Sequence, residues 1–272
     1  MDFKTMISLL LLLLVGLCKA HHANEHEAGS EISVDTSTED ITTTILRMNN
    51  GSTDFLMEGD LQIPNTRNAM KCFNKAYSCL WPKSPNGNVE IPFTISEKYD
   101  NTERNKILNA MRGFATKTCI RFIPRMNQRA YIRIEPRFGC ASLLGRVGDL
   151  QSLSLQRYGC VSNGIIQHEL MHSLGFYHEH TRPDRDDYVK INWENIYEHL
   201  TINFAKKDSN TLNTQYDYTS VMHYGRTYFG KGGSETITPI LDPTAPIGQA
   251  KSLSALDILK INLLYKCWNY IG

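Results

Sequence analysis

Three histidines and one glutamate have the types and the spacing of a catalytic zinc site. His168 and His172 are four residues apart, so on a helix they lie on one face and can bind one metal ion together. Glu169 directly follows the first ligand, which places its carboxylate beside the metal, where a general base takes a proton from bound water. Gly175 can end the helix in the left-handed conformation, and the turn brings His178 back as a third ligand. Three protein ligands leave one position open for water, which indicates a catalytic rather than a structural zinc site.

The longer pattern makes this zinc hypothesis specific. His-Glu-x-x-His alone arises by chance in roughly one chain in a hundred of this length, so a surface helix with two solvated histidines would be a serious alternative. Requiring Gly175 and His178 as well lowers that rate by about three orders of magnitude. The extended pattern is the metzincin signature, which predicts a methionine-containing turn further along the chain. Met222 supplies it, in the sequence Ser-Val-Met-His-Tyr.

Residues 178–186 and the turn at Met222 resemble the astacin family of zinc endopeptidases, and the likeness covers most of the chain from about residue 55 to 267. Four segments are similar to the branch of the fish hatching enzymes, the choriolysins: residues 68–72, 78–81, 117–122 and 216–226. The resemblance implies an endopeptidase that softens the egg envelope by limited proteolysis of its glycoproteins. It also implies one Zn²⁺ per chain, held by the three histidines, with Glu169 as the catalytic base.

The resemblance assigns further roles near the zinc. Tyr224 matches the tyrosine that astacins bring to the metal, where it can bind at rest and later donate a hydrogen bond to the oxyanion. A buried core tyrosine is the alternative. Met222 is expected to pack beneath the histidines and not to be a ligand. Glu179 is similar to a glutamate that the family ties to the mature N-terminus, but the longer N-terminal stretch of this chain leaves its partner open.

Residues 21–67 differ in composition from the rest of the chain. They hold nine Asp and Glu against only Arg47 and Arg67, with runs of Ser and Thr and few large apolar residues before Phe55. Such a segment cannot bury a core of its own, and we expect it to be mobile until it docks. It is either an acidic linker or a propeptide.

The family resemblance favours a propeptide. Residues 57–60, Met-Glu-Gly-Asp, are similar to the astacin prosegment motif, although the family usually begins the motif with Phe where Met57 stands here. The motif implies that Asp60 binds the zinc, displaces the catalytic water and blocks substrate entry, which gives latency. Activation is then expected from a trypsin-like protease that cleaves the Arg67–Asn68 bond. Asn50 lies in a glycosylation sequon in the same segment.

The start of the chain predicts a signal peptide at residues 1–20. It has Lys4, a short apolar run and small residues at the cut after Ala20. The apolar run is too short to span a bilayer comfortably, and no later segment approaches the needed length, so we expect no membrane span. The expected location is extracellular, after secretion, with secretory granules as a place of storage.

The expected mature enzyme, residues 68–272, is long enough for one compact catalytic domain. It carries 25 Lys and Arg against 18 Asp and Glu, a net charge of +7, whereas the whole chain has only +1. This charge favours docking of the acidic prosegment and contact with acidic or glycosylated matrices. The basic residues are scattered and no nucleic-acid motif is present, so we expect no nucleic-acid partner. The expected partner is a protein substrate, and the expected form is a monomer.

Six cysteines remain once Cys18 leaves with the signal peptide. An even number in a secreted domain predicts disulfides, although sequence alone does not select their pairing. A cysteine zinc site is disfavoured because no paired Cys-x-x-Cys spacing occurs. The family resemblance implies three bonds: Cys72–Cys79, Cys119–Cys267 and Cys140–Cys160.

The remaining patterns predict an α+β fold. Alternating apolar residues indicate strands at residues 89–95, 120–123, 131–134 and 153–155. Helical periodicity indicates helices at residues 101–114, 164–174 and 255–265, with Ser162 or Asn163 capping the second and a capping box of Ser254 and Asp257 starting the third. Together with the resemblance, they predict a two-lobed metzincin catalytic domain of astacin type, with a mixed sheet, a zinc helix and an active-site cleft that has the zinc at its floor.

Two other functions remain open at this point. The first is a zinc protease with the same catalytic mechanism but a different biological role, a tissue or immune-cell astacin protease of the nephrosin kind. The other is a non-catalytic zinc-binding module that attaches to a matrix. Intact Glu169 and Tyr224 argue against the module, because a protein without the chemistry needs neither residue.

Overall fold

The computed structural model describes residues 39–52, 56–63 and 79–271. The expected signal peptide, the Arg67–Asn68 bond and Cys72 lie outside the described residues. Within the described part of the chain, no helix has both the length and the apolar character needed to cross a membrane.

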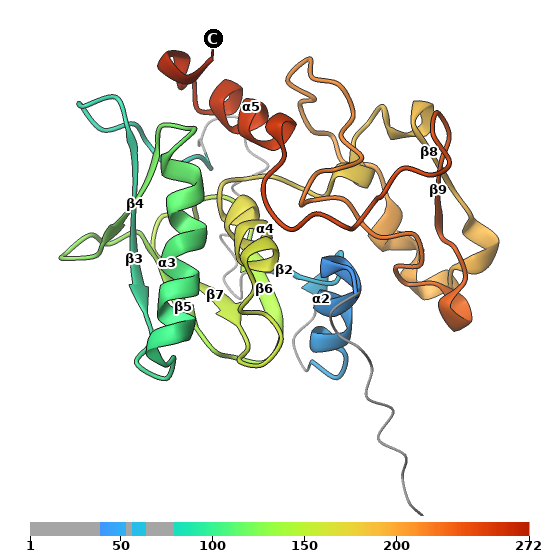
Figure 1. The fold of residues 1–272 in the computed structure, drawn as a ribbon, viewed down its shortest axis with the longest axis horizontal. Coiled ribbons are helices and arrows are strands. Elements are labelled where there is room, and N and C mark those ends of the chain that lie inside the picture. The colour runs from blue at the N-terminus through green and yellow to red at the C-terminus, as the bar shows by residue number, and fades with distance from the viewer. Residues whose placement is uncertain (1–38, 53–55, 64–78, 272) are drawn as a thin grey trace, which may run out of the picture. The chain divides into compact units, whose positions relative to one another are not determined.

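A mixed seven-stranded sheet forms the larger part of the fold (Figure 1). Its central strands β7, β5, β3 and β4 are mutually parallel, while β6 runs antiparallel to β7, as the prediction of a mixed sheet requires. The first two strands belong to the expected prosegment and extend the sheet beside β6. In spatial order the strands are β1 (Leu56–Met57), β2 (Leu61–Gln62), β6 (Cys140–Leu143), β7 (Leu150–Leu155), β5 (Tyr131–Glu135), β3 (Val89–Ile95) and β4 (Ile120–Pro124).

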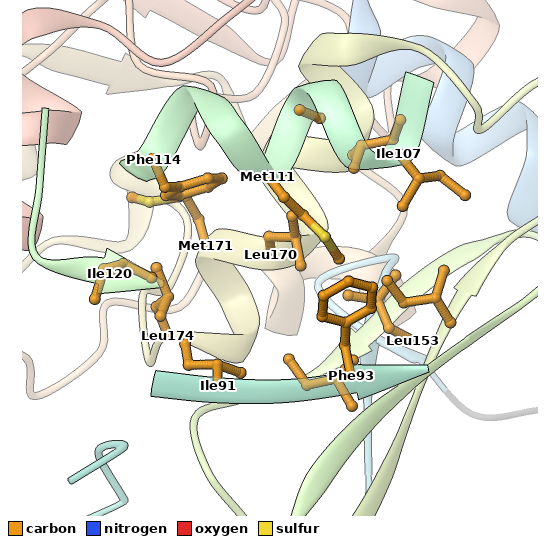
Figure 2. Packing of buried hydrophobic residues seen from close by; sticks show 14 of the residues in the cluster. Ile91, Phe93, Ile107, Met111, Phe114, Ile120, Leu153, Leu170, Met171 and Leu174 are labelled. Atoms are coloured by element: carbon orange, nitrogen blue, oxygen red, sulfur yellow. The ribbon is translucent and has the colours of Figure 1, made fainter. Parts of the chain in front are cut away.

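Two helices cover this sheet with apolar side chains. Helix α3 (Asn101–Ala115) turns Ile107, Met111 and Phe114 toward helix α4 (Asn163–Ser173) and the sheet (Figure 2). These three side chains recur every three or four residues and therefore share one helical face. All are buried, and each contributes about 1.5–3 kcal/mol of hydrophobic stabilisation. The core therefore fixes α4, which carries two of the expected ligands.

The helix ends follow the predictions in part. Helix α5 (Ala255–Leu264) begins with the predicted capping box, because Ser254 accepts a hydrogen bond from the Asp257 amide and Asp257 accepts one from that of Ser254. Ser162 occupies the N-cap of α4, but its side chain makes no capping hydrogen bond there. The prediction of a side-chain cap is therefore wrong, and Asn163, the first residue of α4, instead donates a side-chain hydrogen bond to the carbonyl oxygen of Lys251.

The chain after the third histidine has little regular structure, as expected. Its main elements are 3-10 turns and a two-stranded sheet of β8 (Val189–Ile191) and β9 (Ile237–Pro239), which the sequence patterns did not reveal. A second hydrophobic cluster, which includes Phe204, Tyr224 and Tyr228, forms the core of this part. Two separate clusters agree with the prediction of two lobes.

The structure contains disulfides between Cys119 and Cys267 and between Cys140 and Cys160. The first joins the start of β4 to the chain just after α5. The second joins β6 to the loop that leads into α4. The Cys72–Cys79 pairing stays a prediction, since Cys72 is not described.

The expected prosegment contains a helix that composition did not predict. Helix α2 (Ile41–Asn49) starts at Asp40, whose side chain accepts a hydrogen bond from the Thr43 amide. Its buried face includes Ile45 and Met48, and it packs against α4 and β6. This helix of the expected prosegment therefore packs against the rest of the protein.

Candidate metal centre

Helix α4 carries His168, Glu169 and His172 into the interior of the protein. All three side chains are completely buried. The four-residue spacing of the histidines puts both imidazoles on one side of the helix, with their ring centroids 4.8 Å apart. The helical spacing predicted from the sequence is thus present.

The chain then turns at Gly175 and returns with His178. Gly175 has φ of +100°, a conformation that other residues rarely adopt, and its amide donates a hydrogen bond to the carbonyl oxygen of His172. The His178 ring lies 4.7 Å from that of His172 and 5.1 Å from that of His168, measured between centroids. The three predicted ligands therefore meet at one place.

Each of these imidazoles is held by a partner on its Nδ1 atom. The carbonyl oxygens of Val221 and Phe176 lie 2.6 Å and 2.8 Å from Nδ1 of His168 and His172, respectively. For His178 the partner is the Glu58 carboxylate, at 2.7 Å. A proton on Nδ1 satisfies each contact and leaves Nε2 with a lone pair for a metal ion.

Asp60 of the prosegment lies among the three Nε2 atoms. Its Oδ2 is 2.9 Å from Nε2 of His168 and 3.2 Å from Nε2 of His178, and its Oδ1 is 3.4 Å from Nε2 of His172. One ligand atom from each of the four residues lies within 4.8 Å of all the others. Without a metal ion, the opposing effect of burial is outweighed by protonated imidazoles, which hold the pKa of the Asp60 carboxyl well below its usual range.

The donor set fits a zinc ion. Asp60 Oδ1 and His172 Nε2 are buried without a hydrogen-bond partner among the described residues, although buried polar atoms are normally satisfied. Three imidazoles and one carboxylate are ligands that zinc prefers, and four of them complete a closed coordination set. The arrangement therefore indicates a zinc site to which Asp60 contributes the fourth ligand.

Glu169 lies beside this group on the same helix. Both of its carboxylate oxygens are buried, and neither has a hydrogen-bond partner within the part of the chain that the structure describes. Burial, and after it the negative charge of Asp60, raises the pKa of Glu169 well above its usual value. A carboxyl group with a raised pKa that no such hydrogen bond restrains can accept a proton and return it.

A tight turn at Glu58 and Gly59 delivers Asp60 to the histidines. Both residues have positive φ, +51° and +83°. A Cβ atom on Gly59 would lie only 2.6 Å from the hydroxyl oxygen of Tyr228, so glycine is required by both conformation and space. This explains the third position of the Met-Glu-Gly-Asp motif in physical terms.

Glu58 anchors the turn through its side chain and its backbone. Its carboxylate contacts Nδ1 of His178 and forms an ion pair of 2.8 Å with Lys207. Its amide donates to the side-chain oxygen of Asn203, and its carbonyl oxygen accepts a hydrogen bond from the hydroxyl of Tyr224. The sequence analysis assigned no role to Glu58, because none of these partners is close to it in the sequence.

Other prosegment residues hold the turn from both sides. The side-chain amide of Asn49 donates to the carbonyl oxygens of Gly59 and Cys140, and its oxygen accepts from the Cys140 amide. After the turn, β2 pairs in parallel with β6, with Leu61 opposite Ser142. The docked segment thus extends the main sheet.

The Tyr224 ring lies beside that of His178, with the two centroids 4.6 Å apart. The Tyr224 ring packs between those of His180 and Tyr228, at centroid distances of 3.7 Å and 3.9 Å. Tyr224 is not part of the ligand group in this form, because its hydroxyl is bound to Glu58. Met222 packs in the main hydrophobic core and is not a member of the ligand group.

In this uncleaved chain Glu179 is paired with two basic side chains, while its partner in the mature enzyme stays open. Lys260 from α5 contacts both carboxylate oxygens at 2.7 Å, and Arg182 lies 3.3 Å from one of them. Arg182 also binds Asp184 and the carbonyl oxygen of Thr214, so it fixes the segment after the third histidine. Lys260 was not among the residues that the sequence analysis singled out.

Comparisons with known proteins agree with this geometry. A model of the peptidase family described as Astacin matches residues 75–266. The low choriolytic enzyme of Oryzias latipes is 56% identical over 271 residues, which cover 98% of this chain and 100% of the relative. The high choriolytic enzyme 1 of the same fish is 53% identical over 84% of each chain. The solved structure of that enzyme, described as a hatching enzyme zinc-protease, superposes with a TM-score of 0.68 at 52% identity and covers 73% of this chain and 98% of the other.

Proposed function

Because the chain belongs to the astacin family of zinc metalloendopeptidases, we propose that it is a secreted hatching enzyme, made as a latent proenzyme, that cleaves egg-envelope glycoproteins. The single observation that carries this proposal is the match to a choriolytic enzyme along essentially the whole of both chains. The match includes the prosegment as well as the catalytic part. The proposed substrate is thus a glycoprotein matrix, which the net positive charge of the expected mature chain suits.

Three histidines and one base carry the proposed chemistry. His168, His172 and His178 would hold the zinc ion, which acts as a Lewis acid when bound. Glu169 accepts the proton of the attacking water and passes it to the leaving amine. This role is supported by its buried carboxylate, which no hydrogen bond within the described residues ties down.

Tyr224 is the proposed donor to the oxyanion. In the latent form its hydroxyl donates to the Glu58 carbonyl oxygen. When the prosegment leaves, this hydroxyl loses its acceptor and becomes available to the carbonyl oxygen of the substrate. A donor fixed in this way stabilises the charge that develops in the transition state.

Latency is proposed to come from the segment around Asp60. Its carboxylate occupies the place among the three histidines that a substrate or water needs. We propose that residues 1–20 are a signal peptide, that residues 21–67 are the propeptide and that cleavage of Arg67–Asn68 by a trypsin-like protease releases residues 68–272. Asn50 lies exposed at the end of α2, where a glycan would find room.

The test is hydrolysis of isolated fish egg envelope and of casein by protein cleaved after Arg67. The proposal expects the cleaved protein to attack both substrates and the uncleaved protein to attack neither. Cleavage of casein without attack on the envelope would replace the hatching role with that of a tissue protease. The envelope is therefore the substrate that discriminates between the two roles.

A further inference from the structure

We propose that helix α5 is the positioning element of the metal centre, and that it acts through Asp257, Lys260 and Tyr265. Each of these residues contacts a different segment that carries or orients a zinc ligand. The inference rests on the proposed zinc site and adds a group of residues that no ligand motif contains. Figure 1 shows α5 in red, close to the end of the chain.

Lys260 holds the segment of the third ligand. Its ammonium group lies 2.7 Å from both carboxylate oxygens of Glu179, and Glu179 directly follows His178. Both side chains are buried, with exposed fractions of 6% and 7%. A buried ammonium group is stable only when it is paired, so the position of Glu179 is strongly coupled to that of α5.

Asp257 holds the segment that orients the first ligand. Its carboxylate accepts hydrogen bonds from the Ser220 hydroxyl at 2.6 Å and from the Val221 amide at 3.1 Å. The carbonyl oxygen of the same Val221 is the acceptor for Nδ1 of His168. Asp257 therefore acts on His168 through one intervening residue, as outer partners of metal ligands commonly do.

Tyr265 holds the end of the helix that carries the second ligand. Its hydroxyl donates to the carbonyl oxygen of Leu174 at 2.9 Å. Leu174 is the C-cap of α4 and lies two residues after His172. The segments at Leu174 and Glu179, which adjoin ligands, and the segment at Val221, which orients His168, are consequently tied to one helix.

The helix itself is also held by contacts that lie outside the metal centre. Cys267, just beyond α5, is bonded to Cys119 beside β4, and the Asn262 side chain donates to the carbonyl oxygen of Lys117. The capping box of Ser254 fixes its first turn. A rigidly held helix that contacts all three segments can keep the ligands in place when the prosegment departs.

The test compares Lys260→Met and Lys260→Arg with the wild type in the full-length proenzyme. Zinc affinity is measured by competition with a chelator, and ligand geometry by the visible absorption of the Co²⁺-substituted protein. Outer partners of zinc ligands typically contribute a factor of about 10 to 100 in affinity. We expect Lys260→Met to weaken zinc binding by a factor in this range and to alter the Co²⁺ spectrum. We expect Lys260→Arg to keep most of the wild-type zinc affinity and a spectrum close to that of the wild type.

A matched control and a milder variant separate positioning from stability. Lys83→Met removes a lysine that contacts the carbonyl oxygen of Lys266, near the same helix, but reaches no ligand segment, so its zinc affinity should equal that of the wild type. Tyr265→Phe removes only the hydroxyl bound to Leu174 and should fold even if Lys260→Met does not. We expect Tyr265→Phe to weaken zinc binding severalfold and, after activation, to lower kcat with little change in KM.

The outcomes distinguish this inference from the proposed function. Wild-type zinc affinity and an unchanged Co²⁺ spectrum in folded Lys260→Met, or in Tyr265→Phe, would overturn the inference and leave the zinc site standing. Failure of the wild type to bind zinc would overturn both. Weakened binding in these variants, with Lys83→Met unaffected, would establish α5 as the positioning element.

Discussion

The Asp60 carboxylate lies 2.9 Å from Nε2 of His168, although 108 residues separate them in the sequence. The same oxygen is 3.2 Å from Nε2 of His178. A residue of the prosegment thus completes the ligand set of a site that α4 and the following turn create. This contact links the latency proposed for the chain to the geometry of its metal centre.

Asp60→Ala should make the uncleaved protein active. The change removes the charged group from the ligand cluster, while Glu58, Asn49 and β2 still hold the segment nearby. Charged hydrogen bonds are worth about 1.5–3 kcal/mol each, so we expect proenzyme activity to rise about 10- to 100-fold, though not to the level of the cleaved enzyme. Peptide hydrolysis before cleavage measures this. Glu39→Gln, in the same prosegment but away from the metal, is the control, and equal latency in both variants would contradict the role of Asp60.

Gly59→Ala should weaken latency by displacing the turn. An alanine at φ of +83° costs about 1–2 kcal/mol, and its Cβ would also lie 2.6 Å from the Tyr228 hydroxyl oxygen. Gly51→Ala is the matched control in the expected prosegment: φ is +87° there too, but among the described residues an added Cβ would approach only Phe138, at 4.0 Å. We expect roughly tenfold more proenzyme activity in Gly59→Ala than in Gly51→Ala. After cleavage the two variants should have the same peptidase activity. A difference that persists after cleavage would show that Gly59→Ala acts on something other than latency.

Tyr224→Phe should lower kcat in the activated enzyme. Loss of one oxyanion donor typically reduces kcat by about 10² to 10³, and KM should change little because the donor acts on the transition state. Steady-state kinetics on a peptide substrate give both constants. The ring still packs between His180 and Tyr228, so stability should be kept. Wild-type kcat in this variant would mean that Tyr224 is only a core residue.

The Cys119–Cys267 disulfide should contribute more to stability than Cys140–Cys160. The two bonds span 148 and 20 residues, and a longer closed loop constrains the unfolded chain more. In the chain-entropy account, replacing the first pair by alanine lowers the free energy of unfolding by about 2–5 kcal/mol. Replacing the second pair lowers it by roughly 1–2 kcal/mol less. Urea unfolding of the two double variants measures the difference. A larger loss from the shorter bond would show that native packing, not loop length, dominates.

The zinc ligands were predictable because their spacing is local. His168 and His172 share a helical face, and Gly175 provides the turn to His178, so neighbouring residues contain the whole arrangement. The Asp60 contact, in contrast, came from resemblance to a family motif. No local pattern connects Asp60 with α4, because the contact forms only when two distant segments dock.

Two parts of the fold remained hidden for different reasons. Helix α2 is short and polar overall, but its apolar residues Ile41, Ile45 and Met48 recur at helical spacing after the cap at Asp40, so a closer search could have found it. The pairing of Lys260 with Glu179 joins residues 81 positions apart. It depends on tertiary packing, and neither residue alone predicts the other.

The most direct test of the account is zinc-dependent peptide hydrolysis by the activated protein, with Glu169→Gln beside it. We predict that the wild type loses activity on removal of zinc and regains it on return of the metal. Glu169→Gln should bind zinc normally and be slower by about 10² to 10⁴, since it lacks the base. An activated wild type that binds one zinc and hydrolyses no peptide bond, or a Glu169→Gln variant as fast as the wild type, would contradict the account.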